Sequence, residues 1–423
     1  MKIAVLLLIA ASVTIQAADL SGTWEVRVSG GQLNDARRVK MTSKDGRYEW
    51  TFFGSQFTGT LQGHSVTFKC TEDGKPCGDL TGRLAESGIS GEGTVDGIPI
   101  KWSAQRPVTR PASAPTHHEF TPTVFHREFS GLKEPVLHLF PGDTVHTQTV
   151  DAGGRDATGA HRVFGGNPLT GPFYIEGALP GDTLVVKFTR IRLNRDSAES
   201  GDGVVGTALD PYEFRDQPKV EKFDSEWKLD RENGVGSLKN PTDRLKNYKV
   251  PLHPMIGCVG VAPSASQSFR AGYLGSWGGN MDYNKVVEGT TVFLPVNVPG
   301  ALLYVGDGHA AQGDGELAGD ALETSMDVEF TVDVQQETHL RAPRFEDDEY
   351  VMTSGIGNSM QEALQQATSN MSKYLADRYK LNPAEIGIVL DTAMKYDIAE
   401  VVDPQVHIVA KLPRKALVGL KAE

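Results

Sequence analysis

Apolar and polar residues alternate in short runs between residues 19 and 106, as they do in strands with one buried face. The runs TWEVRV, RYEWTFF, SVTFKC and IPIKWSA are separated by Asp-Gly pairs, which favour tight hairpin turns. The pattern therefore predicts a small all-β domain over residues 19–106, built as a meander or barrel. Trp24, Trp50 and Trp102 are expected to lie in its core, and the alternative is that they line a ligand cavity.

A proline-rich stretch without periodicity follows, and it predicts a linker over residues 107–119. Beyond it, the segments at 140–151, 179–191 and 287–298 each begin with a glycine turn and continue as an alternating Thr/Val-rich strand. These repeated units predict packed antiparallel sheets in a second domain, residues 120–423. Residues 195–250 are polar and irregular, and a loop region of that length is often functional.

Helical spacing replaces alternation near the C-terminus. Apolar residues recur there three or four positions apart and predict an amphipathic helix over about 358–380: Met360, Leu364, Ala367, Met371 and Leu375. Asn382, Pro383 and Glu385 fit the N-cap, first and third positions of a second helix that reaches about Lys395. QVHIVAKL then reads as a strand. The predicted fold is mainly β with some α, with a helical pair near its C-terminus.

The first 18 residues have the pattern of a signal peptide. Lys2 precedes an apolar run from Ile3 to Val13, and small residues near Ala17 and Ala18 offer a cleavage site. The alternative, a membrane anchor, needs about 20 apolar residues, and this run is shorter. We therefore expect export to the periplasm or the medium, with no membrane attachment after cleavage.

Export changes the interpretation of the three cysteines. Cys70 and Cys77 flank a turn-like stretch and are expected to form a disulfide in an oxidising compartment. Cys258 lies in the apolar run MIGCVGVAP, and this context favours a buried structural thiol over a nucleophile. The formal net charge of -12, with no long basic run, argues against a nucleic-acid partner.

The segment GDGHAAQGDGE, residues 306–316, combines glycines with acids and one histidine. It fits a G-x-G-x-x-A dinucleotide fingerprint, but further glycines would interrupt the helix that the fingerprint requires. It also lacks the ligand spacing of an EF-hand. Histidine and carboxylates are ligands of divalent cations, and a cation would offset the repulsion among the acids. The alternative for Asp314 and Glu316 is a solvated turn, whereas His309 favours a site.

Other polar residues follow apolar runs at expected strand ends: Asp151, Glu176, Asn280 and Asp282. Each by itself is typical of a turn or a helix cap. Together they are compatible with polar groups gathered on one rim of a sheet, which the sequence alone does not establish.

The segments NPLTGPFYIEGALPGDTL, HPMIGCVGVAP, GGNMD, LPVNVPGALLYVGDGHAAQGDGE and ALE occur in this order. Together they resemble the acetamidase/formamidase family, whose members hydrolyse short aliphatic amides to ammonia and a carboxylic acid. The resemblance covers roughly residues 120–412 and implies a β-rich fold, a divalent metal, a small amide substrate and a homo-oligomer. The signal peptide and the domain at 19–106 lie outside it, and residues 195–250 match poorly, so a larger amide is an alternative substrate.

These observations lead to a hypothesis of metal-assisted amide hydrolysis, with zinc as the expected metal and calcium as the alternative. The expected metal ligands are Asp151, Asp282, Asp307 and His309. Glu176 or Glu316 is expected to transfer the proton from water to the leaving nitrogen, and Asn280 to stabilise the oxyanion. The alternative is an exported ligand-binding protein with an inactive amidase-like domain.

Overall fold

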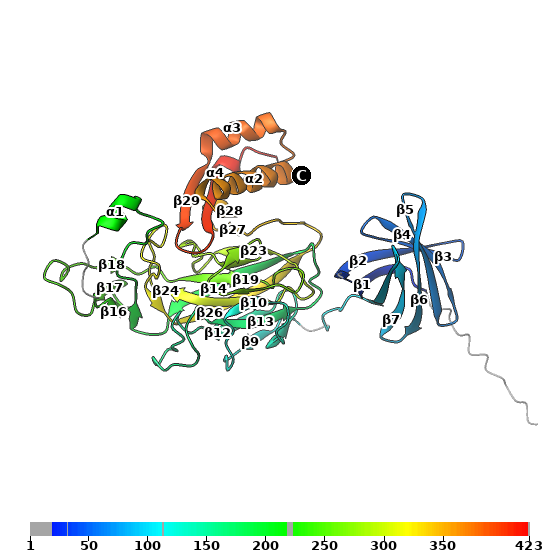
Figure 1. The fold of residues 1–423 in the computed structure, drawn as a ribbon, viewed down its shortest axis with the longest axis horizontal. Coiled ribbons are helices and arrows are strands. Elements are labelled where there is room, and N and C mark those ends of the chain that lie inside the picture. The colour runs from blue at the N-terminus through cyan, green and yellow to red at the C-terminus, as the bar shows by residue number, and fades with distance from the viewer. Residues whose placement is uncertain (1–18, 32, 112–113, 218–222, 422–423) are drawn as a thin grey trace, which may run out of the picture. The chain divides into compact units, whose positions relative to one another are not determined.

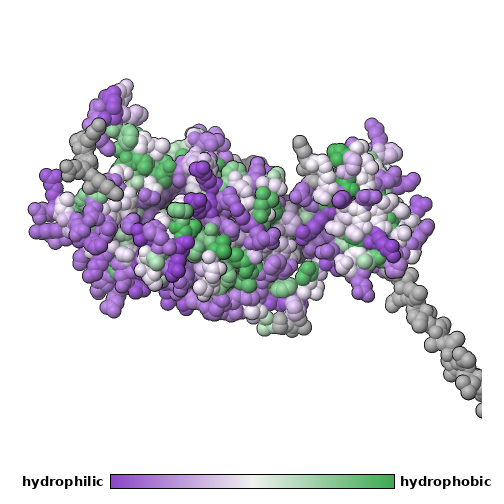
Figure 2. Space-filling view, turned by 60° about the horizontal axis from the view of Figure 1, so that its bottom comes forward, coloured by the Kyte–Doolittle hydropathy of each residue, from purple (hydrophilic) through white to green (hydrophobic). Residues whose placement is uncertain are grey.

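The computed structural model describes residues 19–31, 33–111, 114–217 and 223–421. The predicted signal peptide, residues 1–18, lies outside the described residues. Contacts divide the chain into two compact units, Met1–Pro107 and Val108–Glu423. No helix in the described part of the chain is both long and apolar enough to cross a membrane. Hydrophilic side chains cover most of the face shown in Figure 2, with apolar residues in limited areas.

The first unit is a closed eight-stranded antiparallel barrel (Figure 1). Its strands are β1 (Gly22–Gly30), β2 (Leu33–Lys44), β3 (Arg47–Phe52), β4 (Ser55–Gln62), β5 (Ser65–Glu72), β6 (Lys75–Ala85), β7 (Gly88–Val95) and β8 (Ile98–Gln105). Each strand pairs with the next, and β1 also pairs with β8, which closes the barrel. The barrel interior is packed with apolar side chains that include Trp24, Trp50 and Trp102, as predicted. The Cys70–Cys77 disulfide joins β5 to β6, as predicted for these two cysteines.

The second unit contains two large sheets and a two-stranded one, β10 (Glu128–Ser130) with β20 (Ser268–Arg270). The nine-stranded sheet comprises β9 (His117–Glu119), β12 (Thr144–Gln148), β14 (Thr183–Leu193), β23 (Thr291–Pro295), β26 (Met326–Gln335), β27 (Arg344–Glu346), β28 (Tyr350–Gly357), β29 (Lys395–Glu400) and β30 (Val406–Pro413). The eleven-stranded sheet comprises β11 (Leu137–Leu139), β13 (Leu169–Ile175), β15 (Ser197–Glu199), β16 (Glu226–Asp230), β17 (Val235–Leu238), β18 (Val250–Pro251), β19 (Met255–Gly260), β21 (Leu274–Gly275), β22 (Gly278–Asn280), β24 (Leu303–His309) and β25 (Glu323–Thr324).

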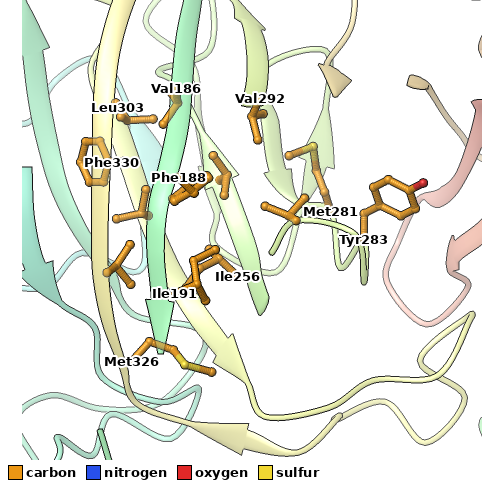
Figure 3. Packing of buried hydrophobic residues seen from close by; sticks show 14 of the residues in the cluster. Val186, Phe188, Ile191, Ile256, Met281, Tyr283, Val292, Leu303, Met326 and Phe330 are labelled. Atoms are coloured by element: carbon orange, nitrogen blue, oxygen red, sulfur yellow. The ribbon is translucent and has the colours of Figure 1, made fainter. Parts of the chain in front are cut away.

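A continuous apolar core joins these two sheets (Figure 3). Ile256 of β19 and Leu303 of β24 come from the eleven-stranded sheet, and Val186, Phe188 and Phe330 come from β14 and β26 of the other. All five side chains are fully buried. Because β19 and β24 are held in this core, the polar residues at their ends have a rigid support.

The three predicted glycine-turn strands all lie in the nine-stranded sheet, as β12, β14 and β23. The prediction of a mainly β protein is therefore confirmed.

The linker prediction included residues 117–119, but these form β9 and pair in parallel with β12. A three-residue strand without apolar alternation gives no signal in the sequence, because its pairing depends on a neighbour that is distant along the chain.

Four helices lie in the described part of the second unit: α1 (Pro211–Asp216), α2 (Met360–Tyr379), α3 (Pro383–Ala393) and α4 (Arg414–Leu417). The helical pair α2 and α3 is present, and Asn382 with Glu385 forms the expected capping box of α3. The predicted apolar stripe of α2 is right for Ala367, Met371 and Leu375 and wrong for Met360 and Leu364. Ala363 is buried against β28 and β30, whereas Met360 and Leu364 are exposed. The small Ala363 allows close approach of helix and sheet, which hydrophobicity alone does not indicate.

Candidate metal centre

The glycine-acid segment 306–316 begins as the end of β24 and continues as a loop that is largely buried. The backbone N–H of Ala310 donates to the carbonyl of Leu322, and that of Gly315 donates to the carbonyl of Ile398. Only Gly313 and Asp314 within the loop are exposed, and Glu316 is buried. Asp314 therefore behaves as the solvated turn residue of the alternative interpretation, and Glu316 does not.

His309 lies at the centre of a buried group of acids. Its Nε2 atom is 3.1 Å from Glu323 Oε1, 3.5 Å from Asp307 Oδ2 and 4.0 Å from Asp282 Oδ1. Two sets of potential ligand atoms share His309: one with Asp282 and Glu316, the other with Asp307 and Glu323. The structure thus brings together four residues named from the sequence, Asp282, Asp307, His309 and Glu316.

The ring orientation of His309 is set by Gln312. The Nε2 amide of Gln312 donates to the carbonyl oxygen of Asp282 at 2.6 Å, so its Oε1 atom faces Nδ1 of His309 at 2.8 Å. Nδ1 must therefore carry a proton and donate it. In the neutral ring this leaves the lone pair on Nε2, directed at the acids, which is the arrangement that a metal-ligating histidine needs.

Burial and mutual repulsion make these acids costly as charged groups. Burial raises the pKa of Asp282 well above its usual value, and the charges of Glu316 and Asp307 raise it further. Burial likewise raises the pKa of Glu323 to about 7. For His309, the negative charges of Glu323 and Asp307 outweigh the effect of burial and raise its pKa well above the usual value. The cluster thus favours positive charge at its centre.

Four buried polar atoms of the cluster have no hydrogen-bond partner within the described part of the chain: Asp282 Oδ1, Asp307 Oδ1, His309 Nε2 and Glu323 Oε2. An unsatisfied buried polar atom costs about 1–3 kcal/mol, and more when it is charged. Four such atoms in one cluster are therefore hard to reconcile with a purely structural role. Oxygen and nitrogen atoms of this kind are ligands of divalent cations, and a cation held by Asp282, Asp307 and His309 would satisfy three of the four.

Backbone conformation also marks the cluster. Asp282, Asp307 and Glu316 have φ values of 39°, 60° and 48°, in the left-handed region that residues with a side chain seldom adopt. Asn167, which contacts Asp307, has a φ of 53°. Such conformations persist where the surrounding structure enforces them, and they concentrate at functional sites.

Gly257 of β19 leaves the space between the acids open. A Cβ atom at this position would lie 2.2 Å from Asp282 Oδ1, 2.8 Å from Asp307 Oδ2 and 3.2 Å from Cε1 of His309. The first two distances are far below van der Waals contact. The absence of a side chain at Gly257 is therefore a condition for this arrangement of donors.

Asn280 connects the acids but does not point at a substrate. Its Nδ2 group donates to Asp282 Oδ2 at 2.5 Å and to Asp403 Oδ2 at 2.7 Å. Its Oδ1 atom accepts from Asn167 Nδ2 at 3.0 Å and from the thiol of Cys258 at 2.6 Å. Because an amide has only two N–H hydrogens, none is left for an oxyanion. The structure replaces the expected oxyanion role of Asn280 with a positioning role, and Cys258 is a buried free thiol, as predicted.

Two residues named from the sequence are not part of the cluster. Asp151 is buried, but it forms an ion pair with Arg195 at 2.7 Å and accepts the backbone N–H of Arg155, so its charge is already balanced. Glu176 follows the far end of β13, and the pairing of Leu169 with Gly306 and of Phe173 with Leu303 carries it away from His309. At about 3.3 Å per residue, the stretch of β24 from Leu303 to His309 alone spans roughly 20 Å. Glu176 instead contacts the exposed His138 at 2.7 Å.

Sequence reasoning missed Glu323, Gln312, Asn167 and Asp403. Glu323 lies in the ALE segment, and its position opposite His309 depends on the pairing of β24 with β25. Asn167 and Asp403 are separated from Asp307 by long stretches of chain, and no local pattern singles them out. Gln312 lies within the glycine-acid segment, but an uncharged amide is not among the usual metal ligands and so gives no signal of a role there.

A cavity of about 830 Å³ reaches the cluster from outside. Glu323 and Asn167 line it beside Asp151, and residues 199–202 and 223–226 form other parts of its wall. The region 195–250, which was singled out for its length and irregularity, thus supplies part of the approach to the acids. The fold and the site define a β-sandwich protein with a buried histidine–carboxylate cluster, which Glu323 connects to a cavity.

Comparisons with known proteins point to one group. A sequence model of the Acetamidase/Formamidase family matches residues 274–417, a range that contains Asn280, Asp282, Asp307, His309 and Glu323. A Schizosaccharomyces pombe protein named "Putative formamidase" is 29% identical over 197 residues, which are 36% of this chain. That match spans about half of the length of the yeast protein, 47%.

Solved structures extend the similarity to a larger share of the chain. A "predicted acetamidase/formamidase" from Thermoanaerobacter tengcongensis is 27% identical with a TM-score of 0.61, covering 72% of this chain and 98% of that one. An acetamidase from Yersinia enterocolitica is 25% identical with a TM-score of 0.62, covering 73% of this chain and 94% of that one. The chain is thus similar in sequence and fold to acetamidase and formamidase proteins.

Proposed function

We propose that this protein hydrolyses the C–N bond of short linear amides, producing ammonia and a carboxylate. The observation that carries the proposal is the set of four unsatisfied ligand atoms of His309, Asp282, Asp307 and Glu323, the last of which lines a cavity of about 830 Å³. The similarity to acetamidase and formamidase proteins supports amides as the substrate class.

The donor atoms fit a divalent cation, with Asp282, Asp307 and His309 as its holders. One imidazole nitrogen with carboxylate oxygens favours zinc, whereas calcium takes oxygen ligands and in larger number. A cation bound there would polarise the amide carbonyl and lower the pKa of water. Asn280 keeps the carboxylates of Asp282 and Asp403 in place, and Gln312 keeps Nε2 of His309 directed at the cation.

Glu323 is the best-placed group for proton transfer. It lies 3.1 Å from His309 and also lines the cavity, so it faces both the cation site and the substrate. Glu316, the sequence-based candidate, is buried and accepts the backbone N–H of Ala321, which leaves it a supporting role. In our scheme, Glu323 takes a proton from water as the new C–O bond forms. It then delivers the proton to nitrogen as the C–N bond breaks, because an amine leaves readily only when protonated.

The test combines metal analysis with ammonia release from formamide, acetamide and longer amides by the purified protein. We expect stoichiometric zinc in the wild type, and loss of both zinc and activity in His309→Ala. Glu323→Gln should retain the metal but lose about 10²–10⁴-fold in kcat, the usual contribution of a general base.

Glu176→Gln is the matched control, because it neutralises an acid that the structure places outside the cluster, and it should leave activity unchanged. An active wild type without stoichiometric metal would overturn the cation-based proposal. A metal-loaded protein that releases no ammonia from any amide would favour the ligand-binding alternative.

We further propose that the protein is exported and forms homo-oligomers. The signal-peptide pattern of residues 1–18 supports export, and the Cys70–Cys77 disulfide suits an oxidising compartment. The oligomer rests on the family resemblance alone. The tryptophan-filled barrel core gives no support to a ligand cavity inside the first unit.

A further inference from the structure

A second cavity of about 770 Å³ lies in the second unit, away from the acid cluster. Its walls come from Phe293 of β23, residues 338–344, Glu346, the C-terminal half of α2 and Arg414. None of the cluster residues Asp282, Asp307, His309 or Glu323 lines it. Its size suits a small organic molecule.

The lining of this cavity is basic, although the protein as a whole is acidic. Six cationic side chains line it: Arg341, Arg344, Lys373, Arg378, Lys380 and Arg414. Glu346 and Asp377 are the acids among the lining residues, which leaves a formal excess of four positive charges. The whole chain has a formal net charge of -12, so this concentration is opposite in sign to the overall composition.

Arg344 is the most constrained of these side chains. Its guanidinium lies over the Phe293 ring at 4.0 Å and near the Tyr374 ring at 5.3 Å. Its Nε lies 3.2 Å from Glu346 but makes no aligned hydrogen bond. Burial lowers the pKa of Arg344; the charge of Glu346 acts against this, and the charges of Arg378 and Arg414 add to it. A partly desolvated arginine beside two further arginines is stabilised by an anion.

Local ion pairs and the α2 helix dipole explain part of the positive excess in the cavity lining, but not all of it. Lys373 pairs with Asp377 at 2.9 Å, and Arg414 pairs with Glu346 at 2.9 Å. Arg378 complements the C-terminal end of the α2 dipole. Arg341 is in neither situation. It lies in the segment before β27 and, like Arg378, forms no ion pair within the described residues.

We propose that this cavity is a binding site for a small organic dianion, separate from the acid cluster. The charged groups of the ligand would be a phosphate ester or two carboxylates, which arginines bind through paired N–H donors. The rings of Tyr374 and Tyr379 offer an apolar wall for the rest of the molecule. This site does not depend on the proposed amide hydrolysis.

Isothermal titration calorimetry on the full-length protein tests the proposal, with phenyl phosphate and glutarate as probes and benzyl alcohol as the uncharged control. We expect one of the dianions to bind and benzyl alcohol not to bind. Phenyl phosphate as the tighter ligand would identify phosphate esters as the class, and glutarate as the tighter ligand would identify dicarboxylates.

The double variant Arg341→Gln/Arg378→Gln should weaken binding at least about tenfold, from the loss of charge-assisted hydrogen bonds. Both side chains are exposed, so the fold should be retained. Lys415→Gln is the control, because Lys415 is an exposed cation next to Arg414 that does not line the cavity. No binding of either dianion at millimolar concentration would overturn the proposal. So would equal binding by wild type and double variant, or self-association that the double variant alone abolishes.

Discussion

Replacing Gly257 with alanine tests the geometry of the acid cluster with a single added methyl group. The backbone of Gly257 is outside the left-handed region, so alanine can adopt it without backbone strain. The added Cβ would start 2.2 Å from Asp282 Oδ1, and ordinary contact begins near 3.4 Å. The carboxylate must therefore move by about 1.2 Å, or the strand must shift by a similar amount.

This displacement sets the expected magnitude. A misplacement of about 1 Å at a reacting centre can lower activity about 10²-fold. Adding a methyl group to a packed site costs about 1–3 kcal/mol of stability, which a unit with so large a core should tolerate. We therefore expect Gly257→Ala to remain folded, to bind zinc more weakly and to release ammonia at least about 10²-fold more slowly.

Zinc affinity is measured by equilibrium dialysis followed by elemental analysis, and activity by an ammonia assay. Circular dichroism checks the fold. Gly313→Ala is the matched control. Gly313 lies in the glycine-acid loop itself, its backbone is also outside the left-handed region, and a Cβ there would meet no atom within 4 Å. Folded Gly257→Ala protein with wild-type zinc affinity and activity would refute the assignment of the space beside Gly257 to the cation.

The remaining predictions concern stability and specificity. Burial lowers the pKa of His407 to about 4, so between pH 6.5 and 4 the unfolded state takes up a proton that the folded state does not. Stability should therefore fall by about 3 kcal/mol as the pH drops through that window, and urea titrations of His407→Gln should lack this contribution. Removing the Cys70–Cys77 bridge with Cys70→Ser/Cys77→Ser should cost the barrel roughly 2–3 kcal/mol, from its short loop; an unchanged melting temperature would contradict this. The cavity leading to the cluster is lined by acids such as Glu199 and Asp202, so an anionic amide such as succinamate should have a lower kcat/KM than a neutral amide of equal length. Equal values would show that these charges do not reach the substrate. A fragment of residues 108–423 should fold and keep its activity, since the contacts divide the chain at that point, and an insoluble or inactive fragment would contradict this.

The sequence by itself determined the local elements. Asp-Gly turns between alternating runs specified the hairpins of the barrel, and the capping residues Asn382 and Glu385 specified the start of α3. The glycine-acid segment showed that His309 and its neighbouring acids were chemically unusual. These features depend on interactions between residues a few positions apart, so they can be recognised from the sequence alone.

Only the tertiary structure decided which of the polar residues meet. Strand pairing placed Glu323 opposite His309 and carried Glu176 to the other end of β13. Hydrogen bonds across the fold used both amide hydrogens of Asn280 and turned Gln312 towards His309. Register and long-range contact depend on how the whole core packs, and no single segment of the sequence contains that information.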